Sequence, residues 1–83
     1  MERKIMIYAL STCIWCKKTL EYFKGKKIRF EHVFVDLLDE PEQSRVIAEM
    51  ESYNPQGNFP TVVIDGRIVT GYDTARFEEE LKK

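Results

Sequence analysis

Two cysteines three positions apart are the residues of this chain with the most specific chemistry. They lie in the tetrapeptide Cys13-Ile14-Trp15-Cys16, and the 83 residues contain no other cysteine. A disulfide between them closes so small a ring that it adds little to stability. Small secreted scaffolds instead carry several disulfides that close longer loops. The pair therefore predicts thiol–disulfide exchange rather than a structural crosslink.

A zinc site cannot be built from these thiols within one chain. Structural zinc takes about four ligands, and the sequence adds a single histidine, His32, to the two cysteines. We therefore predict no metal site in one chain. Two alternatives to redox chemistry stay open, namely a metal or cluster shared between two chains and inert packing of the thiols.

The cysteines are predicted to follow a buried strand and to begin a helix. Residues 4–10 are short and mostly apolar, which is typical of such a strand. Cys16, Leu20 and Phe23 then follow with helical spacing. A thiol at the start of a helix lies near unpaired N–H groups and the positive end of the helix dipole, which favour the thiolate. We therefore predict Cys13 as the attacking thiol and Cys16 as the resolving thiol.

Three residues near the cysteines or before the hairpin each have two interpretations, one functional and one purely structural. Lys17 would add positive potential that lowers the pKa of the attacking thiol, or would simply be a solvent-exposed helix charge. Trp15 would be an exposed platform for a substrate, or would fold back onto the body of the protein. Pro60 in Phe59-Pro60-Thr61 would mark the start of a strand, or would form a cis peptide against the dithiol.

The middle of the chain predicts a second strand and a second helix. Gly25 stands where helices often end in a left-handed residue. Residues 29–37 have the composition of a strand. Asp39 and Glu42 resemble a capping box for the next helix. The apolar side of that helix would contain Val46, Ile47, Met50 and Tyr53.

The end of the chain predicts a hairpin and a last helix. Asp65-Gly66 between the apolar segments 61–64 and 67–70 is a strong hairpin signal. Asp73 can cap the final helix. The element order β-α-β-α-β-β-α then gives an α/β fold with a four-stranded mixed sheet flanked by three helices.

Composition and charge exclude several classes of protein. Hydrophobic residues make up 43% and charged residues 33%, with a net charge of −1, so we predict one globular domain over residues 1–83. A sequence pI near 5.8 argues against nucleic-acid binding. No apolar run approaches the roughly 20 residues of a membrane span. Met1-Glu2-Arg3-Lys4 does not open a convincing leader, so we expect a cytoplasmic monomer that does not bind membranes.

Three elements in matching order resemble the glutaredoxins: Cys-x-x-Cys after the first strand, Phe-Pro-Thr before the hairpin, and Gly-Tyr-Asp before the last helix. The similarity covers essentially the whole chain. It implies a thioredoxin fold, with Pro60 in cis beside the dithiol, Cys13 as nucleophile and Cys16 as resolving thiol. It also implies that the bound peptide or glutathione contacts residues from these segments. Those residues are Thr12, Trp15, Phe59, Pro60, Thr61, Gly71, Tyr72 and Asp73.

Three positions depart from the common glutaredoxin pattern. Ile14-Trp15 stands where Pro-Tyr is common, Leu10 where many members carry a lysine that binds a glutathione carboxylate, and Thr70-Gly71 where a glycine pair is usual. These departures bring the chain closer to glutaredoxin-like proteins with thioredoxin-like activity. Such proteins take electrons from a reductase protein and donate them to ribonucleotide reductase.

The expected function is that of a thiol–disulfide oxidoreductase that reduces protein disulfides or glutathione mixed disulfides. We expect no tightly bound cofactor, with glutathione as a candidate co-substrate. A small electron donor to ribonucleotide reductase, recharged by a thioredoxin-type reductase, is the first alternative. A dimer that holds an iron–sulfur cluster through Cys13 and glutathione is the alternative of another class, and an adaptor without turnover is the third.

Overall fold

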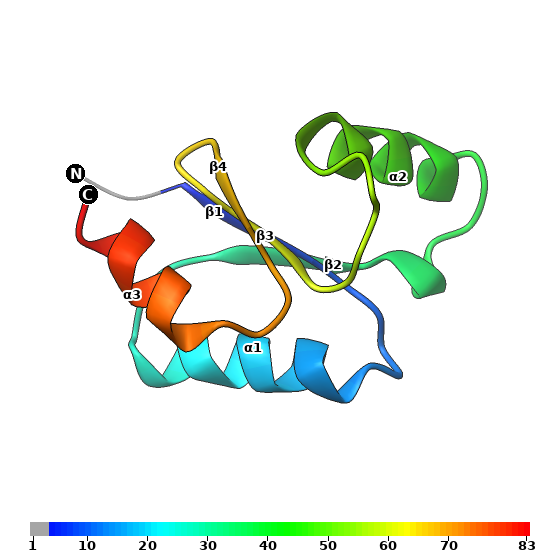
Figure 1. Ribbon diagram of the computed structural model, residues 1–83. Coiled ribbons are helices and arrows are strands. Elements are labelled where there is room, and N and C mark those ends of the chain that lie inside the picture. The colour runs from blue at the N-terminus through cyan, green and yellow to red at the C-terminus, as the bar shows by residue number, and fades with distance from the viewer. Residues whose placement is uncertain (1–3) are drawn as a thin grey trace.

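A mixed four-stranded sheet forms the middle layer of the protein, with α1 and α3 on one face and α2 on the other (Figure 1). The computed structural model describes residues 4–83, so part of the segment considered as a leader lies outside the described residues. The strands are ordered β2-β1-β3-β4. The elements are β1 (Ile5–Ala9), α1 (Ile14–Gly25), β2 (Glu31–Phe34), η1 (Val35–Leu37), α2 (Glu42–Tyr53), β3 (Thr61–Ile64), β4 (Arg67–Thr70) and α3 (Thr74–Leu81).

The predicted order of strands and helices is confirmed, and β1 shows why it forms the centre of the fold. Ile5, Ile7 and Ala9 pack into the core beneath α1 and α3, whereas Tyr8 packs with Met50 of α2. Successive residues of a strand point to opposite faces. A central strand covered on both faces therefore has a continuous apolar sequence.

Pairing between the strands brings several chain segments to one end of the sheet. β1 is parallel to β2, with Ala9 opposite Phe34. β1 is antiparallel to β3, with Tyr8 opposite Thr61. β3 is antiparallel to β4, with Thr61 opposite Thr70. The last residues of β1, β2 and β4 and the first residue of β3 consequently lie together at one end of the sheet.

The hairpin and the last helix begin as the sequence predicts. Asp65 and Gly66 have φ angles of 50° and 84°, the left-handed conformation of a tight two-residue hairpin turn. The side chain of Asp73 accepts a hydrogen bond from the Arg76 backbone N–H at 3.1 Å and so caps α3. Both features depend on neighbouring residues alone, which is why local sequence identified them.

Two predicted details of the middle segment are wrong. The second strand ends at Phe34 rather than continuing to residue 37, because its partner β1 ends at Ala9 and leaves nothing for later residues to pair with. No capping box forms, since α2 begins after Pro41 without a side-chain cap. Glu40 instead accepts hydrogen bonds from the Ser44 backbone and hydroxyl at 2.8 and 2.6 Å.

The end of α1 also differs from its prediction. Gly25 is the last helical residue, and the left-handed residue is Lys27, with a φ of 58°. The N–H of Lys27 donates to the carbonyl of Lys24 at 3.1 Å. The left-handed residue therefore lies two positions after Gly25, where it was predicted. In α2, Met50 is the buried residue, whereas Tyr53 is exposed.

Ion pairs attach the end of α3 to the start of β4. The carboxylate of Glu80 is almost fully buried and contacts Arg67 of β4. Arg76 and Lys83 add weaker contacts to the same carboxylate at 3.6 and 3.4 Å. The hydrogen bond from Arg67 holds the pKa of Glu80 below its ordinary value. Among residues 4–83, no helix has the length and apolar character needed to cross a membrane.

Candidate active site

Cys13 lies at the boundary between the loop after β1 and the first turn of α1. Its backbone is extended, and it forms the N-cap of the helix. The backbone N–H of Cys16 donates to the Cys13 sulfur at 3.3 Å. An N–H group aimed at sulfur, together with the positive end of the helix dipole, stabilises a negative charge on that sulfur. Cys13 is partly exposed, so this sulfur is also accessible.

Cys16 has the opposite environment. It is fully buried and belongs to the core cluster with Leu20 and Phe23, as the predicted apolar stripe requires. Burial raises the pKa of the Cys16 thiol to about 12, and the hydrogen bond and charge of Cys13 act in the same direction. The backbone N–H of Leu10 donates to the Cys16 sulfur at 3.4 Å and partly offsets this rise. The two thiols are both free and differ in exposure.

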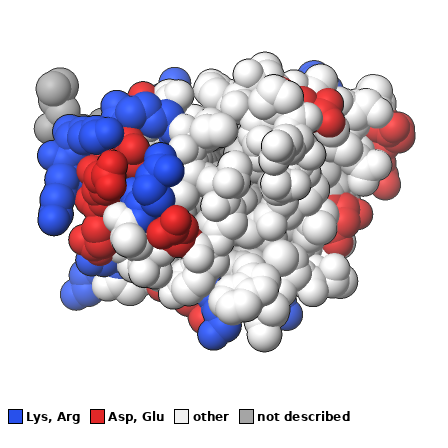
Figure 2. Space-filling view, viewed as in Figure 1, with Lys and Arg blue, Asp and Glu red and all other residues white. Residues whose placement is uncertain are grey.

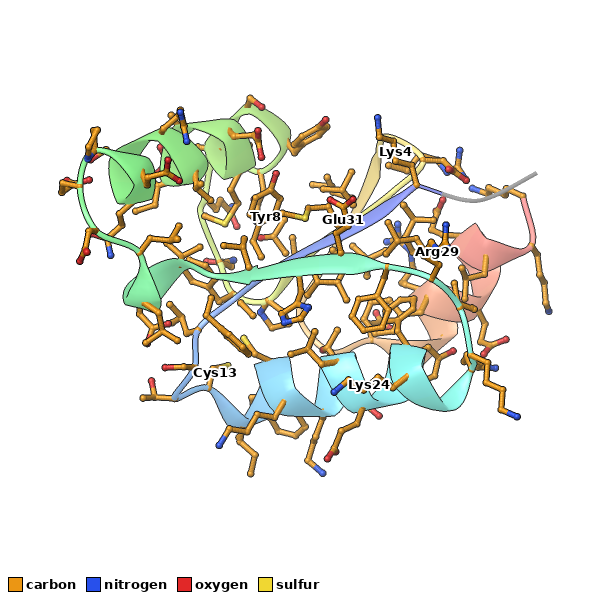
Figure 3. All side chains as sticks on the ribbon, turned by 180° about the vertical axis from the view of Figure 1, so that it is seen from behind. Lys4, Tyr8, Cys13, Lys24, Arg29 and Glu31 are labelled. Carbon is orange, nitrogen blue, oxygen red and sulfur yellow. The ribbon has the colours of Figure 1, made fainter. Side chains whose placement is uncertain are left out.

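The loop that delivers Cys13 is anchored by a carboxylate from another element. Asp36 of η1 accepts hydrogen bonds from the Ser11 backbone at 2.8 Å and from the Ser11 hydroxyl at 2.5 Å. These hydrogen bonds hold the pKa of Asp36 below its ordinary value. The N–H of Cys13 also donates to the Leu10 carbonyl at 3.2 Å, which closes the turn before the helix. Figure 3 shows Cys13 at the end of this loop, where it enters α1.

A cleft of about 240 Å³ lies beside the dithiol. It is lined by five residues that the sequence singled out, which come from three separate segments: Trp15, Phe59, Pro60, Gly71 and Tyr72. The Phe59–Pro60 peptide is cis, as the resemblance implies. The N–H of Gly71 donates to the Pro60 carbonyl at 2.9 Å, and its φ of 76° turns the chain toward α3. The rings of Trp15 and Tyr72 stack with their centroids 5.9 Å apart.

The remaining predicted site residues are not part of the lining of this cleft. Thr61 is fully buried, and its hydroxyl donates to the Asn58 carbonyl at 2.5 Å and accepts from the Asn54 amide at 3.1 Å. Its side chain thus binds the protein itself, so contact with a substrate would have to come from its backbone. Thr12, Lys17 and Asp73 are exposed, and Asp73 caps α3. The effect of Lys17 on the thiol stays a prediction.

Sequence reasoning missed two residues that hold the site in shape. Asp36 interrupts an otherwise apolar run, and a single carboxylate in such a run was the available signal. Asn54 is 4% exposed, its N–H donates to the Met50 carbonyl at 2.9 Å, and its amide reaches Thr61. Because Asn54 precedes a proline in a segment rich in turn formers, its burial could not be anticipated from local composition.

A second cleft, of about 600 Å³, lies away from the dithiol. Its lining includes Lys4, Arg29 and Glu31. Figure 3 shows these three side chains at the other end of the sheet from Cys13. This cleft therefore contributes nothing to the chemistry of the thiols. Within residues 4–83, no group of three or more histidine, cysteine or acidic side chains is placed to hold a metal ion.

The sheet, its flanking helices and the dithiol at the start of α1 define a protein of the thioredoxin fold, the fold of a large class of thiol–disulfide oxidoreductases. The family model named Glutaredoxin matches residues 5–69, and the chain belongs to the glutaredoxin family. It is 39% identical over 79 residues to an uncharacterized glutaredoxin-like 8.6 kDa protein in the rubredoxin operon of Clostridium pasteurianum. The aligned residues cover 95% of this chain and 99% of that protein.

Solved structures agree with this assignment. Methanoredoxin of Methanosarcina acetivorans is 40% identical to this chain, with a TM-score of 0.91. The match covers 96% of this chain and 85% of methanoredoxin. A glutaredoxin of Archaeoglobus fulgidus is 33% identical with a TM-score of 0.90, covering 95% of this chain and 86% of that one. The expected family and fold are therefore confirmed.

Proposed function

We propose that this protein reduces disulfides in other proteins and that Cys13 and Cys16 alternate between dithiol and disulfide during each cycle. The observation that carries the proposal is the asymmetry of the two sulfurs. Cys13 is accessible and accepts an N–H hydrogen bond, whereas Cys16 is buried with a raised pKa. A thiolate is the attacking species in thiol–disulfide exchange. The first attack therefore belongs to Cys13.

The reaction then has two exchange steps. In the first, the Cys13 thiolate attacks one sulfur of the substrate disulfide, a mixed disulfide forms, and the other substrate sulfur leaves as a thiolate. In the second, Cys16 gives up its proton and attacks the Cys13 sulfur, which releases the second substrate thiolate. The substrate has gained two electrons, and the protein ends as a Cys13–Cys16 disulfide. The Leu10 N–H hydrogen bond to Cys16 favours the thiolate needed for this step.

Single cysteine substitutions test the assignment of roles. Cys13→Ser should abolish reduction of insulin disulfides. Cys16→Ser should form the mixed disulfide and stop there, so a covalent protein–substrate adduct should accumulate on a non-reducing gel. As a matched check on the native protein, iodoacetamide at neutral pH should label Cys13 well before Cys16. Full insulin reduction by Cys13→Ser, or faster labelling of Cys16, would show that the nucleophile is assigned wrongly.

We further propose that a reductase protein, rather than glutathione, returns electrons to the disulfide. Leu10 supplies no charge at the position where many glutaredoxins hold a glutathione carboxylate, and the cleft lining contains no charged side chain. The relative in a rubredoxin operon fits a setting of redox proteins. Turnover should be faster with NADPH and thioredoxin reductase than with glutathione and glutathione reductase at equal electron supply. Faster turnover with glutathione would overturn the donor assignment without affecting the roles of the cysteines.

A further inference from the structure

Two segments of the chain carry opposite charge. Residues 14–29, which contain α1 and the turn after it, hold six of the 13 basic residues but one of the 14 acidic residues, a net charge of +5. Residues 36–51, which run from η1 into α2, have six acidic residues and one basic residue, a net charge of −5. All of these charged side chains are exposed. We call the two segments the basic surface and the acidic surface.

Both surfaces begin beside the reactive thiol, on opposite faces of the sheet. α1 begins directly after Cys13. Asp36, the first residue of the acidic surface, accepts two hydrogen bonds from Ser11, two positions before Cys13. Figure 2 shows red side chains on the right, where η1 and α2 lie in Figure 1, and blue side chains at the lower edge, where α1 runs. A partner docked at Cys13 is therefore flanked by positive charge on one side and negative charge on the other.

Contacts near the thiol leave these charges uncompensated. The donors to Asp36 and Glu40 are the backbone and hydroxyl groups of two serines, Ser11 and Ser44, which carry no charge. The Nζ of Lys18 lies 5.9 Å from the centre of the Trp15 ring, which attracts a cation without neutralising it. Separated charges of this kind create a potential that steers a charged molecule as it approaches. Across an interface, complementary charge also fixes the orientation of the partner.

We propose that the two surfaces orient the protein substrate, so that its disulfide segment lies with acidic residues over α1 and basic residues over η1 and α2. The protein thereby selects disulfides whose two flanks carry opposite charge in this order over those with the reverse order. This inference rests on the proposed function, because the surfaces act only on a partner that Cys13 attacks. The exchange steps are those already given, and the surfaces change how often a productive encounter occurs.

Two peptide disulfides of reversed polarity test the inference. Each has one cysteine linked to the same chromophoric thiol, two glycines on either side, four glutamates beyond one pair and four lysines beyond the other, and blocked ends. An extended chain advances about 3.3 Å per residue, so these charges lie about 10–20 Å from the cysteine. Cys13 and Lys24 are about 16 Å apart along α1 at 1.5 Å per residue, so the charges can reach the surfaces. The two peptides share composition, net charge and leaving group.

The faster of the two peptides should exceed the other about tenfold in kcat/KM at about 0.01 M salt, where the Debye length is about 30 Å. At about 1 M salt the Debye length is about 3 Å, and the ratio should approach one. Because both peptides meet the same thiolate, the ratio cancels any change in the acidity of Cys13. It therefore reports the orientation of the partner.

Matched variants locate the preference in the two surfaces. Lys24→Glu/Asp39→Lys takes two of the five net charges from each surface and leaves the net charge of the chain unchanged. If the logarithm of the ratio follows the charge of the surfaces, the ratio should fall to about fourfold. Lys4→Glu/Glu79→Lys is the control, since both side chains are exposed outside the two surfaces, and it should keep the full ratio. Glu21→Lys replaces the single acidic residue of the basic surface and should raise the ratio above that of wild type.

Neutral substitutions give a milder second set. The side chains of Lys24 and Asp39 are exposed, so thermal unfolding should show folded proteins for every variant. Lys24→Gln/Asp39→Asn takes one net charge from each surface without placing a charge of the wrong sign on either. By the same scaling, its ratio should be about sixfold, between those of wild type and the charge-reversed variant.

The outcomes separate the inference from the function on which it rests. Reduction of both peptides at equal kcat/KM in low salt would overturn the inference and leave the cysteine roles intact. A ratio that persists at about 1 M salt, or that is unchanged in Lys24→Glu/Asp39→Lys, would also overturn it, because recognition would then lie elsewhere. Failure of wild-type protein to reduce either peptide, with Cys13 reactive to iodoacetamide, would contradict the proposed function and the inference together.

Discussion

Replacing Thr61 by valine should destabilise the protein through a single buried hydrogen-bond network. The hydroxyl of Thr61 joins the amide of Asn54 to the carbonyl of Asn58 and so ties the loop before Pro60 to the start of β3. Valine keeps the volume and removes the hydroxyl, which leaves the Asn54 amide donor buried without a partner. An unsatisfied buried donor costs about 1–3 kcal/mol. A loss of about 2 kcal/mol lowers the midpoint of thermal unfolding by about 8–16 °C in a domain of this size.

Urea unfolding of five proteins isolates the network from other effects of substitution. In wild type, Asn54→Ala should cost free energy of unfolding, and in the Thr61→Val background the same change should cost at least about 1 kcal/mol less. Thr61→Ser keeps the hydroxyl and should lose only the contribution of one methyl group, about 0.5–1.5 kcal/mol. Additive losses for Asn54 and Thr61, or equal losses for the serine and valine variants, would refute the reasoning. Thr61→Val should also raise KM for protein disulfides, because the loop before Pro60 is no longer held.

Further predictions concern pH and backbone conformation. Burial holds the pKa of Cys16 near 12 against an ordinary value of 9.0, so the stabilising effect of this difference is fully present below pH 9 and is lost as pH rises toward 12. Reduced wild-type protein should therefore become easier to unfold in urea across that range, and Cys16→Ser should show a flatter profile. Lys27→Gly should stabilise the protein by about 0.5–1 kcal/mol by relieving a left-handed lysine, whereas Gly66→Ala should destabilise it by about 1 kcal/mol or more. Calorimetry that gave both changes the same sign would contradict this conformational account. Asp73→Ala should lose about 1 kcal/mol with the helix cap, and Asp73→Asn should keep it. A loss in calorimetric stability as large for asparagine as for alanine would show that the charge, and not the cap, is what matters.

Several features that depend on a few neighbouring residues were predictable from the sequence, although the local signals for a capping box at Asp39 and for a left-handed Gly25 were wrong. The spacing of Cys16, Leu20 and Phe23 gave the buried stripe of α1, and Asp65-Gly66 gave the hairpin. In each case the deciding interaction lies within the same element or turn. Local chemistry was sufficient because no distant partner changes the outcome.

Features that depend on distant partners were not predictable. The second strand stops at Phe34 because β1 stops, and no property of residues 35–37 announces that limit. Asp36 and Asn54 gain their roles from Ser11 and Thr61, which lie 25 and 7 positions away in the chain. Composition gives no reason to bury Asn54, and the isolated carboxylate of Asp36 in an apolar run indicates a role without identifying Ser11 as its partner.

The site itself is a product of strand register. Cys13 follows β1, Pro60 precedes β3, and Tyr72 follows β4, and these segments meet because Tyr8 pairs opposite Thr61 and Thr61 opposite Thr70. Each strand is fixed in this register by the side chains it buries, since a slip of one residue would turn those side chains to the other face. β1 is apolar on both faces, and the alternation of its side chains, with Ile7 toward α1 and Tyr8 toward α2, therefore aligns the thiols with the cleft. A chain that kept Cys-x-x-Cys but lost this alternation would keep the nucleophile and lose the surface that presents a substrate to it.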